Sequence, residues 1–277
     1  MQPCEPPTEQ EIWKIARRTI GIIKSHLTEN VCLFGSAGTA LWVNIGRVPN
    51  VRRATQSCLS ILFWLKRLLF ESQDIDIVVS EDPGEQFSPE WIKDMIRRAD
   101  YRYFLEPSKQ PGATHHILYC RLPGWATDPG RRVKLDILVP PTLGLPKITV
   151  SEAIPINGIP VMPVFDLLIM RTQGWWEHRI SSRSDFRKKV NNDVSEIFAL
   201  LQRAMEEGVS YVNEANKRRH SPEFMGRART FVNSFVNIHG GYQQWRALQF
   251  PVANADTRGA VLVVEALSSY ILTDDLE

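Results

Sequence analysis

This chain has little of what marks several specialised classes of protein. It has only 4 cysteines among 277 residues, at positions 4, 32, 58 and 120, and their spacing fits neither a disulfide framework nor a zinc motif. Free thiols are typical of a reducing compartment, so we expect a cytoplasmic location, with the nucleus as an alternative.

Long hydrophobic runs and charge of one sign are also scarce. The apolar stretch at residues 59–70 is too short to cross a bilayer and is interrupted by Lys66 and Arg67, so we expect no membrane partner. The formal net charge is only +2, which gives no strong nucleic-acid signature. With 43% hydrophobic and 23% charged residues, the composition is that of an ordinary globular protein.

The most informative feature that is present is a pair of acidic residues inside an apolar, β-branched run. Asp74 and Asp76 belong to the segment Asp74-Ile75-Asp76-Ile77-Val78-Val79. Because residues i and i+2 of a strand point to the same face, the two carboxylates are expected side by side. Burying them is costly unless a cation neutralises them, so the pair indicates a divalent metal site.

A third carboxylate follows on a second strand pattern. In residues 132–139, three apolar side chains alternate with Lys134 and Asp136. Three carboxylates with open positions suit Mg²⁺ or Mn²⁺, which keep water and substrate phosphates as further ligands. Two such ions about 3.5–4 Å apart can hold both the attacking and the leaving oxygen of a displacement at phosphorus.

A glycine-rich segment supplies a candidate phosphate site. After a short buried strand at 31–34, Gly35-Ser36-Ala37-Gly38-Thr39 predicts a turn that leads into a helix from Ala40. Glycines let backbone N–H groups approach an anion, and a helix N-terminus favours negative charge. We therefore expect Gly35 and Ser36 to bind phosphate. Lys134 shares the face of Asp136 and is either a phosphate contact or a charge partner.

Taken in order, these motifs resemble the nucleotidyltransferase superfamily, which includes the DNA polymerase beta-like and minimal nucleotidyltransferases, and most closely fungal nucleotidyltransferase-domain proteins. The resemblance covers residues 30–205. It rests on the segments Phe34-Gly35-Ser36-Ala37, Asp74-Ile75-Asp76-Ile77-Val78, Lys134-Leu135-Asp136-Ile137-Leu138-Val139-Pro140 and Asp166-Leu167-Leu168 with Gln173-Gly174-Trp175.

The resemblance implies an activity and a set of site residues. It implies Mg²⁺-dependent transfer of a nucleoside monophosphate from an NTP to a hydroxyl, with catalytic and metal-binding roles for Asp74, Asp76 and Asp136. It also implies that basic residues downstream contact the triphosphate, and we expect Arg171 with Lys188 or Lys189. For each of these three, a solvated helix face is the alternative. The acceptor stays open among a small molecule, a protein and an RNA end, and so does the choice of NTP.

The expected fold is α/β (α+β), with a mixed-sheet nucleotidyltransferase core flanked by helices and followed by a helical C-terminal region. Thr8 and Glu11 form a capping box that opens the first helix, and Asn157-Gly158 predicts a hairpin turn. Strands are expected at about 101–105, 115–121 and 132–139. The expected parts are residues 1–29, an N-terminal helix; residues 30–162, the catalytic core; and residues 163–277, the helical region.

Residues 51–73 separate the Gly-Ser segment from the acidic pair more widely than the resemblance leads us to expect. Val51 is encoded by a codon that begins with GT, and Gln73 can be encoded by CAG, which are the two ends of a spliceosomal intron. We therefore interpret residues 51–73 as a translated intron in the gene model. The alternative is a genuine inserted helix.

A second function class stays open at this point. In this alternative, the chain is a catalytically inactive module that keeps the nucleotidyltransferase fold and binds or regulates a partner, as antitoxin-like proteins do. A genuine insert at 51–73 favours this alternative. The neighbouring histidines His115 and His116 have no third ligand at metal-binding spacing, so they do not predict a separate metal site.

Overall fold

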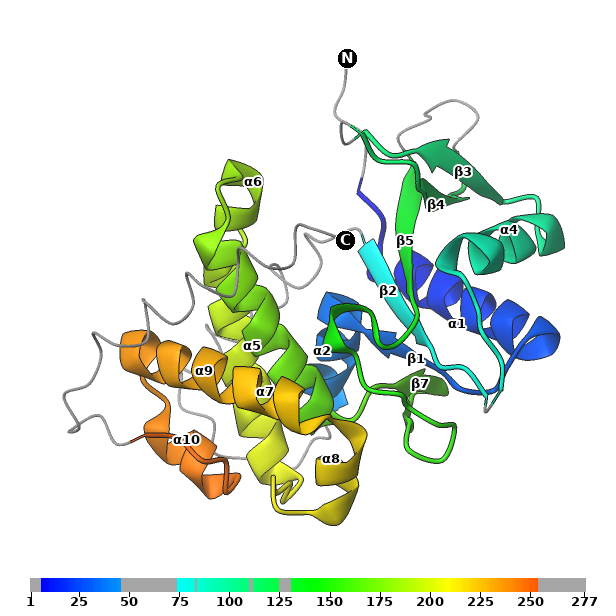
Figure 1. Cartoon of the computed structure of the whole chain (residues 1–277). Coiled ribbons are helices and arrows are strands. Elements are labelled where there is room, and N and C mark those ends of the chain that lie inside the picture. Colours follow the sequence, from blue (N-terminus) through cyan, green and yellow to red (C-terminus); the bar gives the residue numbers. More distant parts are fainter. Residues whose placement is uncertain (1–5, 46–73, 83, 110–111, 125–130, 254–277) are drawn as a thin grey trace.

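In the computed structural model of the chain, the described residues are 6–45, 74–82, 84–109, 112–124 and 131–253. They form a seven-stranded mixed sheet with helices packed against it, followed by a region built from helices (Figure 1). The expected class of fold, a mixed α/β sheet with a helical C-terminal region, is confirmed.

Among the described residues, helices and strands are mixed up to residue 161, and from residue 164 to residue 253 the regular elements are all helices. The first group of elements is α1 (Glu9–His26), β1 (Val31–Phe34), α2 (Gly35–Ile45), β2 (Asp74–Val79), α4 (Pro89–Ala99), β3 (Tyr103–Pro107), β4 (His116–Arg121), β5 (Arg132–Leu138), the 3₁₀ turn η1 (Thr142–Gly144), β6 (Ile154–Ile156) and β7 (Ile159–Val161). The helical region contains α5 (Val164–Ile180), α6 (Ser184–Arg187), α7 (Val190–Glu206), α8 (Glu214–Arg219), α9 (Pro222–His239) and α10 (Tyr242–Ala247).

The order of strands places β2 at the centre of the sheet. The order is β3-β4-β5-β2-β1-β7-β6, with β2 parallel to β5 and antiparallel to β1. The two strands that carry the predicted carboxylates are therefore hydrogen-bonded neighbours. The strand that leads into the Gly-Ser segment lies on the other side of β2.

Alternation along β5 separates a buried face of the sheet from a polar one. In β5, Val133, Leu135 and Ile137 are buried, whereas Lys134 and Asp136 are half-buried. Helices α1 and α4 contact each other and the strands, and α2 packs on β1 and β2 while also contacting α5 and α7 (Figure 1). Helix α2 thus joins the sheet to the helical region.

Short sequence motifs predicted where several helices and strands begin or end. The Thr8 hydroxyl accepts the backbone N–H of Glu11, and the Glu11 carboxylate accepts the backbone N–H of Thr8, as the capping box predicts. Asn157 and Gly158 join β6 to β7 with positive φ angles of 51° and 74°, as the hairpin requires. One expectation was wrong: the Gly-Ser segment is not a turn before the helix, because α2 begins at Gly35 itself.

The hypothesis about residues 51–73 falls outside the described residues and stays a prediction. Within the described ranges, none of the helices combines the length and apolarity that crossing a membrane would demand.

Candidate functional site

The three predicted carboxylates lie on adjacent strands in matching register. In the parallel pair β2·β5, Asp76 is the partner of Asp136, and Asp74 is the partner of Lys134. Partners in a parallel pair point to the same face, so the side chains of all four residues emerge together on the polar face of the sheet. The structure therefore brings Asp74, Asp76 and Asp136 together, as the sequence predicted.

Lys134 neutralises two of these carboxylates. Its Nζ lies 2.5 Å from Oδ2 of Asp136 and 3.5 Å from Oδ2 of Asp74. Burial acts to lower the pKa of Lys134, but Asp136 and Asp74 outweigh burial and hold that pKa above its usual range. Lys134 is thus a charge partner of the carboxylates in this arrangement, one of the two roles expected for it.

The carboxyl group of Asp76 has a strongly raised pKa. Burial raises its pKa to about 7, and the like charges of Asp136 and Asp74 act in the same direction. Arg171 and Lys134 act in the opposite direction but do not restore the ordinary value. A bound divalent cation would stabilise the ionised form of such a group.

Gly35 forms the wall of the site behind Asp76. Its φ angle is +62°, and a Cβ atom built there would lie only 1.9 Å from Oδ2 of Asp76. A side chain at position 35 would therefore overlap the carboxylate. The glycine expected to serve phosphate binding is also the residue that gives Asp76 its space.

Ser36 and Arg171 belong to one buried polar network. Nη2 of Arg171 donates to Oγ of Ser36 at 3.0 Å, and that hydroxyl donates to Oε1 of Glu196 at 3.1 Å. Nε of Arg171 lies 2.8 Å from Oε2 of Glu196 as an ion pair. Arg171 on α5 and Glu196 on α7 are therefore both hydrogen-bonded to the Ser36 hydroxyl in the first turn of α2.

Two more side chains extend this network. Nη1 of Arg171 contacts Oδ1 of Asp193 at 3.4 Å, and Oδ2 of Asp193 lies 2.6 Å from Nδ1 of His178. Burial opposes the charge of Arg171, but Glu196 and Asp193 outweigh it and hold the pKa of the guanidinium above its usual range. Arg171 was expected to contact a triphosphate, yet it lies inside this cluster, where two carboxylates and a hydroxyl already engage it.

Sequence reasoning missed Glu196, although a signal for it existed. Asp193 and Glu196 fall on the stripe of α7 that also contains the buried residues Ile197 and Leu200. A carboxylate on the apolar side of an amphipathic helix needs a buried cation, and Arg171 on α5 was the available one.

Lys188 and Lys189 lie in the junction between α6 and α7. Both are exposed, and Nζ of Lys189 lies 5.8 Å from the centre of the Phe186 ring. They do not belong to the carboxylate cluster or to the network around Arg171. Their contact with a triphosphate stays a prediction.

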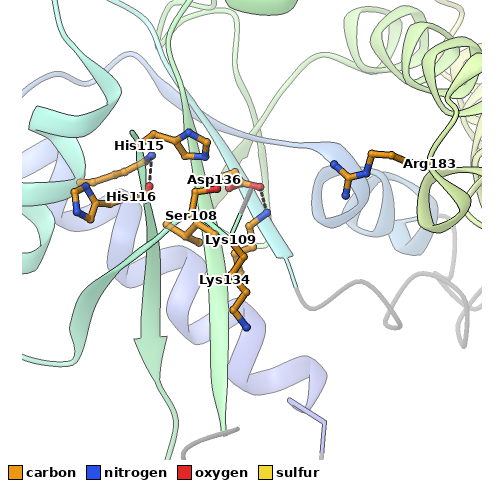
Figure 2. Close-up of a pocket in the computed structure, with 9 residues that line it drawn as sticks. Ser108, Lys109, His115, His116, Lys134, Asp136 and Arg183 are labelled. Atoms are coloured by element: carbon orange, nitrogen blue, oxygen red, sulfur yellow. Dashed lines mark hydrogen bonds and ion pairs between the residues drawn. The ribbon is translucent and has the colours of Figure 1, made fainter. Parts of the chain in front are cut away.

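A depression of about 520 Å³ borders Asp136 and Lys134 (Figure 2). Figure 2 shows His115, His116, Ser108 and Lys109 on one side of it, and Arg183 extending from the helical region on the other. No motif in the sequence predicted this depression. Its basic side chains are Lys93, Lys109, His115, His116, Lys134 and Arg183.

The carboxylates on the polar face supply oxygen donors, which are the kind of ligand that Mg²⁺ and Mn²⁺ prefer. Within the described ranges, no three His, Cys, Asp or Glu side chains stand in a ready metal-binding arrangement. Coordination of Mg²⁺ or Mn²⁺ therefore stays a prediction. Comparisons of the chain with family models, with curated proteins and with solved structures gave no match.

Proposed function

We propose that the chain is a Mg²⁺-dependent nucleotidyltransferase that moves a nucleoside monophosphate from an NTP to a hydroxyl acceptor and releases pyrophosphate. The observation that carries this proposal is the register of β2 and β5, which sets Asp76 beside Asp136 with Asp74 on the same face. The contact between Gly35 and Asp76 supports it, since it brings the N-terminus of α2 against the carboxylates.

Each of these residues has a role in the proposed site. Asp74, Asp76 and Asp136 would hold Mg²⁺ or Mn²⁺. The metal would supply charge neutralisation for the triphosphate and acidify an oxygen bound to it. The backbone N–H groups of the first turn of α2 have no partners within the helix and are suited to the phosphate oxygens. The hydroxyl of Ser36 is engaged with Arg171 and Glu196, so its part is to fix that turn.

The reaction makes one bond at the α-phosphorus and breaks another. The acceptor oxygen forms the new P–O bond, and the bond between the α-phosphorus and the bridging oxygen of pyrophosphate breaks. The proton of the acceptor hydroxyl passes to a carboxylate oxygen of Asp136, which borders the open depression. Lys188 and Lys189, exposed after α6, are suited to neutralise the pyrophosphate that leaves.

Transfer from labelled NTP in the presence of Mg²⁺ tests the proposal. With cell extract as the source of acceptor, we expect the full chain to release labelled pyrophosphate from γ-labelled NTP and to label an acceptor from α-labelled NTP. Asp76→Asn should abolish both reactions and leave the fold intact. Asp94→Asn is the matched control, because Asp94 lies on α4 and pairs only with arginines of its own helix among the described residues. An unaltered rate in Asp76→Asn refutes the proposed site.

One observation favours a second candidate function, a catalytically inactive module that binds or regulates a partner. The Lys134 ammonium bridges Asp136 and Asp74, and a lysine in this position can replace a metal ion as a structural counter-charge. In that case the carboxylates stabilise the sheet and bind no substrate.

A thermal shift measurement separates the two candidates. For the enzyme, Mg²⁺ and an NTP together should raise the melting temperature more than either does alone, since ligands that bind only the native state stabilise it. For the inactive module, the melting temperature should not respond to the pair. Comparing ATP, GTP, CTP and UTP in the same assay also identifies the preferred nucleotide.

A further inference from the structure

Resting on the proposed function, we infer that the depression beside Asp136 is the acceptor site and that it selects a small acceptor carrying a phosphate near its hydroxyl. The depression has the reacting face of the sheet as one wall, since Asp136 and Lys134 line it. A molecule held there presents its hydroxyl to the carboxylates.

The adjoining wall is built from the ends of β3 and β4, beside β5 in the sheet, and is held in place. The backbone N–H of Ser108 donates to the carbonyl of His115 at 3.1 Å, which closes the two strand ends on each other. From α4, Glu90 accepts the backbone N–H of His116 at 3.1 Å. The wall is therefore a fixed part of the sheet edge, and it carries Lys109 and His115.

Lys93 supplies a cation at the base of this wall. Its residue exposure is only 8%, and its Nζ donates to Oε1 of Glu90 at 2.7 Å and to the carbonyl of His116 at 2.8 Å. An ammonium has three protons to donate. Among the described residues these are the two acceptors of Lys93, so one proton remains for an anion in the depression.

The balance of charge in the depression favours an anion. Four cationic side chains and two histidines line it, against the single carboxylate of Asp136. Asp185 offsets Arg183 through a 2.6 Å contact, and Glu90 offsets Lys93. Lys109 and His115, both exposed, have no acidic partner among the described residues. A cation that neutralises Asp74 and Asp136 would also release Lys134 from these carboxylates, so that its charge could face an anion.

The size of the depression favours a small acceptor over a nucleic-acid chain. Its volume of about 520 Å³ lies within the range of small-molecule sites. A polynucleotide needs an extended basic track, whereas the formal net charge of the chain is only +2. A phosphorylated sugar or polyol carries both a hydroxyl and a phosphate dianion in one small molecule.

Chemical footprinting of lysines on the full chain tests the inference without relying on activity. The protein is acetylated with and without ribose 5-phosphate, ribose, or a short single-stranded RNA, in the presence of Mg²⁺, and each lysine is quantified by mass spectrometry. We expect ribose 5-phosphate at millimolar concentration to slow the modification of Lys109 several-fold and ribose to have no effect. Lys14, exposed on α1, is the internal control and should react equally in every sample.

Variants connect the footprint to the depression. The double variant Lys109→Gln with His115→Asn should lose at least tenfold in affinity for ribose 5-phosphate by calorimetry, whereas the matched pair Lys14→Gln with His26→Asn should bind as the unaltered chain does. Stabilisation by Mg²⁺ with NTP should persist in both. If that stabilisation is absent from the unaltered chain, the proposed function fails.

If the stabilisation is present, three results overturn the inference alone: equal protection of Lys109 by ribose, no protection by ribose 5-phosphate, or protection by RNA only. Each leaves the nucleotide site standing. Protection of Lys109 by ribose 5-phosphate in the unaltered chain, together with the loss of ribose 5-phosphate affinity in the double variant, establishes the site.

Discussion

The carboxylate of Asp76 and the backbone of Gly35 lie so close together that no other residue fits at position 35. A Cβ atom there would be 1.9 Å from Oδ2 of Asp76, and the φ angle of +62° is itself unfavourable for residues other than glycine. This contact couples the start of α2 to the central acidic residue of the sheet.

Gly35→Ala should therefore lower the free energy of unfolding by at least about 2 kcal/mol, because it adds both a steric overlap and a left-handed backbone penalty. Urea denaturation measures the change. Gly174→Ala is the control, since a Cβ atom at Gly174 within α5 meets no other atom within 4 Å. If the two variants are equally stable, the contact between Gly35 and Asp76 does not exist in solution.

The network around Arg171 makes a second prediction. Arg171→Leu leaves Glu196 and Asp193 buried without their cation, which should cost about 3–5 kcal/mol of stability. Ser36→Ala removes two hydrogen bonds of the same network and should cost about 1–2 kcal/mol. Lys188→Gln, at an exposed position, should change stability by less than about 0.5 kcal/mol.

A double-mutant cycle measures the interaction energy between Arg171 and Glu196 in this network. In the background of Glu196→Gln, the loss caused by Arg171→Leu should shrink by at least about 1 kcal/mol. Strictly additive losses would show that the ion pair between Arg171 and Glu196 contributes nothing to the junction of α5 and α7.

Lys134 makes a prediction about metal binding. The ammonium competes with a divalent cation for Asp136 and Asp74, and two unit charges 4 Å apart interact by about 4 kcal/mol near a protein surface before screening by salt. Lys134→Met should therefore bind Mn²⁺ about tenfold more tightly than the unaltered chain, as measured by electron paramagnetic resonance of free Mn²⁺.

The matched control for this measurement is Lys14→Met, which should leave Mn²⁺ binding unchanged. Undetectable Mn²⁺ binding in both the unaltered chain and Lys134→Met would favour the inactive module over the enzyme.

The lowered pKa of Asp100 predicts how the free energy of unfolding changes at acidic pH. Burial acts to raise its pKa, but hydrogen bonds from the Arg102 backbone and from the Arg18 and Arg102 side chains outweigh burial, so the pKa lies below its usual range. Because the unfolded chain takes up the proton first, this stabilisation is complete above the ordinary carboxyl pKa of about 3.9 and is lost as the pH falls further.

Asp100→Asn should consequently lower stability at pH 7 by about 1–3 kcal/mol and flatten the decline below pH ~4. Denaturation at a series of pH values checks both parts. Glu29→Gln, which removes only an exposed ion pair with Lys24, should leave the pH profile as it is. A profile for Asp100→Asn parallel to that of the unaltered chain would contradict the assignment.

Sequencing of cDNA across the codons for residues 51–73 tests the interpretation of that segment as a translated intron. We expect transcripts in which the codon for Asn50 is followed directly by that for Asp74. If every transcript retains the segment, the insert is genuine, and the case for an inactive module becomes stronger.

Local chemistry in the sequence determined much of the fold. Alternation in residues 132–139 fixed which side chains of β5 are buried, and Thr8 with Glu11 fixed where α1 starts. Such features depend on neighbours within a few residues along the chain. The same reasoning placed Asp74 and Asp76 on one strand face, because the period of a strand is two residues.

What the tertiary structure alone decided depends on segments far apart in the chain. The pairing of Asp76 with Asp136 required the register of β2 against β5, and the engagement of Arg171 required a contact between Ser36 and Glu196, which are separated by 160 positions. The basic depression is lined by residues of α4, the ends of β3 and β4, strand β5 and the N-cap of α6, which no sequence spacing connects. A sequence pattern specifies the face on which a side chain lies, but only packing between distant elements decides what that face meets.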